Sequence, residues 1–167
     1  MKFNKLIGLA LSGFLMTTTA HAEPKPVSSA KELVGCYERI NFSPEFTKLM
    51  NPKEYWPEPY QWFCFDSDGK FSSMMSTHHS EQTTAKLRQT LNRLPQVFRY
   101  DYVTSGVIKT ETVPGQPVQK LYWQVTFMDK NITTPDGTLV GKNTVVMGLI
   151  DPETDKVVYW RYLKKLK

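Results

Sequence analysis

Short runs of alternating apolar and polar residues, separated by turn signals, recur along most of this chain. In one such run the aromatic residues Phe98, Tyr100 and Tyr102 share a face, and charged residues lie on the other. Successive side chains of a β-strand point to opposite faces of the sheet, so a period of two predicts strands with one buried face. We therefore expect antiparallel strands that are joined mainly by hairpins.

The turns between these runs predict about eight strands and one helix. The helix is expected over 81–94, where leucines recur at helical spacing before Pro95. The Asp68-Gly69 pair is typical of a tight hairpin, because glycine supplies the positive φ that such a turn needs. The expected strands cover residues 33–40, 60–65, 70–76, 97–103, 106–113, 121–127, 139–150 and 156–166.

This pattern predicts an all-β, mainly antiparallel fold, either an up-and-down barrel of about eight strands or a sandwich. A barrel is favoured because pairing the last strand with the first leaves no free edge. Eight strands also enclose an interior that can hold one small ligand. The last strand carries several basic residues that would keep an incompletely closed edge soluble, namely Lys156, Arg161, Lys164, Lys165 and Lys167.

The first 22 residues are typical of a secretory signal peptide. A basic start precedes an apolar stretch over 6–16, and a small-x-small cleavage site ends at Ala22. We expect cleavage after Ala22, a mobile leader over 23–30 and a single domain over 31–167. The apolar stretch is too short to span a bilayer. The expected localisation is therefore a bacterial periplasm or the outside of the cell.

Cys36 and Cys64 are the only cysteines in the chain. An even, small number of cysteines in an exported protein favours a disulfide, which would stabilise the fold by roughly 3–4 kcal/mol. The alternative is two buried, unpaired thiols. The segment 33–36 also matches a lipidation motif, but polar residues separate it from the apolar signal core. We therefore expect no stable membrane anchor.

Charge and motifs exclude several classes of function. The chain has 21 Lys and Arg against 16 Asp and Glu, and its basic residues are scattered without a nucleic-acid-binding motif. No nucleophile elbow, phosphate loop or His-Glu-x-x-His motif is present, so we expect neither an enzyme nor a cofactor. His78 and His79 are adjacent, and on an extended segment they point in opposite directions. They therefore suit neither a catalytic triad nor a shared metal ion.

The segment 32–37, Glu-Leu-Val-Gly-Cys-Tyr, resembles the opening strand of bacterial lipocalin-like domains, which begins Leu-x-Gly-x-Trp. The hairpin over 65–71 and the expected helix after it are similar to the next part of these domains. Tyr37 stands where the family has Trp, and a Cys36–Cys64 pair is not part of the family pattern. The resemblance implies a lipocalin-like barrel with an apolar cavity for a small hydrophobic molecule, and it carries over no catalytic residue.

Aromatic residues supply the candidate binding sites. A row of tyrosines on one strand face suits a partly wet cavity, although it is also typical of an ordinary β core. We expect a non-enzymatic protein that binds a small hydrophobic or amphipathic molecule, with a cavity wall formed by Tyr37, Trp62, Tyr100, Tyr102 and Trp123. The alternative is a protein–protein interaction module whose proline-containing loop over 41–59 docks a partner through exposed Tyr55 and Trp56.

Overall fold

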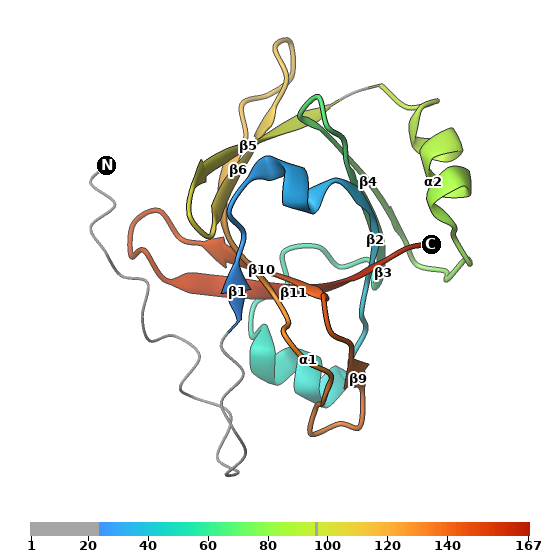
Figure 1. The fold of residues 1–167 in the computed structure, drawn as a ribbon, viewed down its shortest axis with the longest axis vertical. Helices are drawn as coiled ribbons and strands as arrows, with labels where there is room; N and C mark the ends of the chain where they lie inside the picture. The colour runs from blue at the N-terminus through green and yellow to red at the C-terminus, as the bar shows by residue number, and fades with distance from the viewer. Residues whose placement is uncertain (1–23, 96) are drawn as a thin grey trace.

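The computed structural model describes residues 24–95 and 97–167, so the expected signal peptide over 1–22 lies outside the described residues. Eight antiparallel strands close into a barrel (Figure 1), in which each strand pairs with the next and the last pairs back with the first. The predicted all-β, eight-stranded up-and-down barrel is therefore confirmed. In chain order the strands are β2 (Gly35–Arg39), β3 (Tyr60–Phe65), β4 (Lys70–Ser76), β5 (Phe98–Thr104), β6 (Val107–Thr112), β7 (Lys120–Phe127), β10 (Val145–Ile150) and β11 (Val157–Lys165).

The N-terminal segment belongs to the barrel. β1 (Lys25–Pro26) pairs with β7, and the Val27 N–H donates to the Val125 carbonyl at 3.1 Å. The Val27 side chain is fully buried. Within the leader expected over 23–30, residues 25–27 are therefore joined to the barrel, because the sheet offers backbone partners to this segment and the core accepts its valine.

The short 3-10 helix η1 (Ala30–Leu33) lies across one end of the barrel (Figure 1). Two inward-facing tyrosines reach it from the wall. The Tyr37 hydroxyl donates to the Leu33 carbonyl at 2.9 Å, and the Tyr100 hydroxyl donates to the Asp66 carbonyl at 2.9 Å and lies 3.4 Å from the Ala30 carbonyl. This end of the barrel is therefore closed, and we call it the η1 end.

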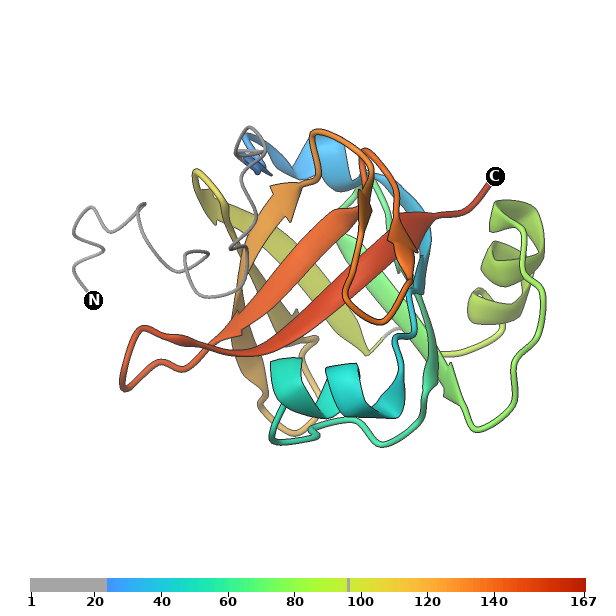
Figure 2. The same cartoon turned by 90° about the horizontal axis from the view of Figure 1, so that it is seen from below.

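The described residues contain two α-helices where the sequence predicted one. α2 (Thr84–Leu91) is the expected helix, and it lies outside the barrel wall (Figure 2) with Leu87 and Leu91 buried against β2 and β4. α1 (Pro44–Met50) forms within the expected loop over 41–59. The Ser43 hydroxyl accepts the Phe46 N–H at 3.2 Å, and proline is well tolerated in the first turn of a helix. In this segment Pro44 is therefore the first residue of a helix, although prolines were expected only to interrupt regular structure.

The connection from β7 to β10 carries a separate two-stranded sheet, formed by β8 (Ile132–Thr133) and β9 (Leu139–Val140). The strand expected over 139–150 is therefore interrupted before β10 begins. Asn143 adopts a left-handed conformation with φ of 65° at this interruption.

Alternate residues of β2 and β3 face opposite sides of the barrel wall. Tyr37 and Phe63 lie in the interior core, whereas Cys36, Cys64 and Trp62 lie on the outer face beneath α2. Cys36 and Cys64 are paired neighbours across the two strands and form the expected disulfide, which is typical of proteins in oxidising compartments.

The seam between β4 and β5 is short. Its register contains two residue pairs, Lys70 with Arg99 and Phe71 with Phe98, because the strands overlap only near their first residues. From Ser72 to Ser76, β4 has no register partner in β5 among the described residues. The inward-facing side chains of this stretch consequently border the end of the barrel that lies away from η1.

Candidate functional site

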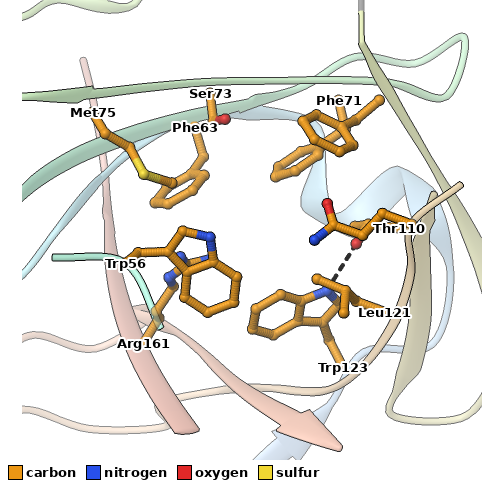
Figure 3. Close-up of a pocket in the computed structure, with 11 residues that line it drawn as sticks. Trp56, Phe63, Phe71, Ser73, Met75, Thr110, Leu121, Trp123 and Arg161 are labelled. Carbon is orange, nitrogen blue, oxygen red and sulfur yellow. Dashed lines mark hydrogen bonds between the residues drawn. The ribbon is translucent and has the colours of Figure 1, made fainter. Parts of the chain in front are cut away.

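A small cavity lies inside the barrel at the end opposite η1 (Figure 3). Its volume of about 60 Å³ has room for a few water molecules or a small chemical group, and it is partly open to solvent. Most of its wall is apolar, with Phe63, Phe71, Met75, Phe98, Leu121, Trp56 and Trp123. The polar side chains in the wall are Ser73, Thr110, Gln119 and Arg161.

Strand periodicity places most of this wall. Phe71, Ser73 and Met75 occupy alternate positions of β4, so all three point inward. Leu121 and Trp123 are related in the same way on β7. These side chains of β4 and β7 therefore face the cavity because successive residues of a strand alternate between its two faces.

The polar wall residue Thr110 is paired within the wall itself. It accepts a hydrogen bond from the Trp123 indole N–H at 2.9 Å, drawn as a dashed line in Figure 3. Both side chains are almost fully buried. This bond fixes the plane of the Trp123 ring, and it leaves the indole N–H satisfied without a ligand.

Trp56 comes from the segment between α1 and β3 rather than from a strand. Its ring packs against Trp123 at a centroid distance of 5.9 Å and against Tyr159 at 5.2 Å. The expected full exposure of Trp56 is therefore wrong, because the ring turns inward and covers part of the cavity. Tyr55 remains 36% exposed and packs edge-on against Tyr159.

Arg161 lies in the middle of β11 and is only 4% exposed. Its guanidinium carbon lies 3.9 Å from the centre of the Trp56 ring, with the rings of Phe63, Trp123 and Tyr159 within 4.9 to 5.5 Å. These aromatic faces attract the cation. Arg161 was expected to solubilise a strand edge, but the strand alternation and closure of the barrel turn it into the interior.

The guanidinium of Arg161 is incompletely paired. Its Nε and Nη2 atoms are buried and have no hydrogen-bond partner among the described residues. No carboxylate of the described chain lies within ion-pairing distance, 4.0 Å or less, of this group. Burial lowers the pKa of Arg161 to about 10, so the side chain stays positively charged at neutral pH.

The five residues expected to form the cavity wall occupy four different environments. Trp123 lines the cavity, whereas Tyr37 and Tyr100 fill the interior at the η1 end. Trp62 lies outside the barrel, and Tyr102, 36% exposed, follows Tyr100 toward the end of β5. The four residues other than Trp123 are therefore not part of this cavity wall.

The sequence contained a signal for the missed residue Arg161. In β11 the positions 159, 161 and 163 share a face, and the neighbours of Arg161 on that face are Tyr159 and Leu163, which are fully buried. A cation between two core residues at this spacing indicates an inward-facing charge. Its place beside Trp56 could not be read from the strand pattern.

Neither the family models, nor the curated proteins, nor the solved structures compared with this chain gave a match. Within residues 24–95 and 97–167, no group of three or more His, Cys, Asp or Glu side chains could hold a metal ion. The helices described above are too short or too polar to cross a membrane.

Proposed function

We propose that this protein is an exported, non-enzymatic binding protein that holds a small amphipathic molecule in the cavity at the end of its barrel opposite η1. The observation that supports this function is an aromatic-lined cavity inside a closed eight-stranded barrel, with a buried cation in its wall. Apolar walls with a few placed polar groups are typical of small-molecule sites. Binding would remove apolar surface from water, which contributes about 25 cal/mol per Å².

The size of the cavity limits the ligand. The interior toward the η1 end is filled by side chains such as Tyr37, Phe65 and Tyr100. A short apolar group fits the remaining space, and a larger molecule has to displace the ring of Trp56. That ring is carried by an irregular segment, which moves at lower cost than a paired strand.

The same proposal includes a lipocalin-like identity and an extracytoplasmic location. The closed barrel of eight antiparallel strands supports the first, together with Tyr37 buried near the η1 end where the family has Trp. The Cys36–Cys64 disulfide supports the second, because such bonds persist in oxidising compartments such as the periplasm or the extracellular medium.

Titration of the purified protein with hexanoate and with hexanamide tests the binding function. Tryptophan fluorescence reports the cavity, because Trp56 and Trp123 form part of its wall. We expect a saturable change with at least one probe. The variant Ser73→Leu should weaken that binding by filling the cavity, whereas Ser72→Leu, on the opposite face of β4, should not.

The absence of a saturable response to both probes would contradict a small-molecule function. Equal loss of binding in Ser72→Leu and Ser73→Leu would place the binding site elsewhere. Mass spectrometry of the natively purified protein provides an independent check, because a resident ligand should appear as a discrete added mass that disappears on denaturation.

A further inference from the structure

The two unpaired nitrogens of Arg161 define which chemical group the cavity recognises. We propose that the ligand carries a carboxylate, which accepts parallel hydrogen bonds from Nε–H and Nη2–H of Arg161 while its apolar part contacts Phe71, Met75 and Leu121. This inference rests on the proposed binding function and specifies its ligand class.

The unliganded arrangement of Arg161 is energetically costly. A buried charge without a partner destabilises a protein, and buried arginines are therefore normally paired with a carboxylate. Arg161 is held among four aromatic rings, and no carboxylate of the described residues forms an ion pair with it. Cation–π contacts offset part of this cost but leave the N–H donors unsatisfied. A negatively charged ligand would pair with the buried charge of Arg161 and accept hydrogen bonds from its unsatisfied N–H groups.

The geometry of the guanidinium also fits a carboxylate. Nε and Nη2 lie along one edge of the planar guanidinium, and their N–H bonds are parallel. This edge matches the two oxygens of a carboxylate, which is the basis of bidentate arginine recognition. The Trp56 ring covers a face of the guanidinium at 3.9 Å, and the Nε and Nη2 atoms along its edge are buried and have no hydrogen-bond partner among the described residues.

The number of charges in the cavity wall also favours a carboxylate. Among the described residues that form this wall, Arg161 is the single charged side chain, and Ser73, Thr110 and Gln119 are neutral. One cation in an apolar cage balances a monoanion, whereas a dianion such as a phosphate monoester would bury an unbalanced charge. The small volume also favours a short carboxylate over a bulky anionic group.

The matched pair hexanoate and hexanamide isolates the carboxylate, because the two probes share a chain length and differ in charge at the head group. We expect the wild-type protein to bind hexanoate about 10- to 100-fold more tightly than hexanamide. Arg161→Met should abolish this preference while retaining hexanamide binding. Arg161→Lys keeps the positive charge but lacks the two parallel N–H donors of the guanidinium, so it should lose most of the preference for hexanoate. Arg93→Met is the control, since Arg93 is exposed and lies outside the cavity wall, and its removal should change hexanoate affinity by less than about threefold.

A second measurement uses the wild-type protein and does not depend on how the variants fold. In a ¹⁵N–¹H spectrum the Arg161 Nε–H resonance should move downfield on addition of hexanoate and stay in place on addition of hexanamide. Equal affinity for the two probes, or an unshifted Arg161 resonance at saturation with hexanoate, would overturn the carboxylate inference and leave the binding function standing. Failure of both probes to bind would overturn the binding function itself.

Discussion

Replacing Arg161 with methionine should make the unliganded protein more stable. Burial lowers the pKa of Arg161 from the ordinary value of a guanidinium to about 10, which corresponds to about 3 kcal/mol of cost for keeping the charge in the folded state. Methionine removes this cost but also loses the cation–π contacts, of which the one with Trp56 at 3.9 Å is the closest. These contacts contribute about 1–2 kcal/mol. The net expectation is a gain of about 1–2 kcal/mol in the free energy of unfolding.

The pH dependence of this gain follows from the direction of the pKa change. A base whose pKa is lowered in the folded state is penalised wherever it is charged in both states, which here means below about pH 10. The cost declines only as the pH rises through that value. The advantage of Arg161→Met should therefore be constant between about pH 6 and 9.

Urea unfolding monitored by circular dichroism measures the effect. The midpoint for Arg161→Met should rise by about 0.5–1 M with an unchanged slope. Arg93→Met is the matched control, because Arg93 is exposed and its replacement removes the same charge from the surface. That control should change the stability by less than about 0.5 kcal/mol. A lower midpoint for Arg161→Met, with Arg93→Met unchanged, would refute the reasoning and show that the guanidinium holds the aromatic rings together.

Three further perturbations test other parts of the structure. Replacing Cys36 and Cys64 with serine should lower the free energy of unfolding by roughly 3–4 kcal/mol in a denaturant titration, and thiol titration of the unfolded, unreduced wild type should find no free thiol. Leu87→Ala should cost about 2–5 kcal/mol and loosen α2, visible as faster amide exchange in that helix, because Leu87 is fully buried against the barrel wall. Hydrogen bonds from the Thr134 hydroxyl and from the Ser43 and Thr138 N–H groups lower the pKa of Asp136 to about 2. The stabilisation from Asp136 should therefore be complete above about pH 4 and be lost as the pH falls toward 2, and an NMR titration of its carboxyl carbon should show that midpoint.

Local signals in the sequence predicted much of the fold. The strands follow from period-two alternation, and the hairpin between β3 and β4 follows from Asp68-Gly69, with Gly69 at a φ of 85°. The helix α2 was also predicted from a local pattern, because its leucines repeat at helical spacing. α1 was missed because the prolines of its segment were interpreted as interruptions, although Ser43-Pro44 is also a favourable start for a helix.

The candidate site was predicted less well, because alternation separates two faces of a strand without saying what covers each. In β3 both faces are buried, and a large aromatic side chain lies on each, Phe63 inside the barrel and Trp62 outside beneath α2. Trp62 is therefore a large aromatic residue, as expected for a cavity wall, but it lies on the outer face of the barrel. Similarly, Tyr100 faces inward as expected, but its hydroxyl is bonded to backbone carbonyls near η1 rather than facing a vacant space.

The sequence by itself predicted the approximate positions of the eight barrel strands, their order and the pair of cysteines, because these depend mainly on neighbours along the chain. Only the tertiary structure decided that Arg161 and Trp56 meet at one end of the barrel, where about 60 Å³ stays open. These two residues are far apart in the chain, and their contact depends on the closure of β11 against β2 and on the path of an irregular segment. Contacts of that kind arise from packing in three dimensions, which no local pattern encodes.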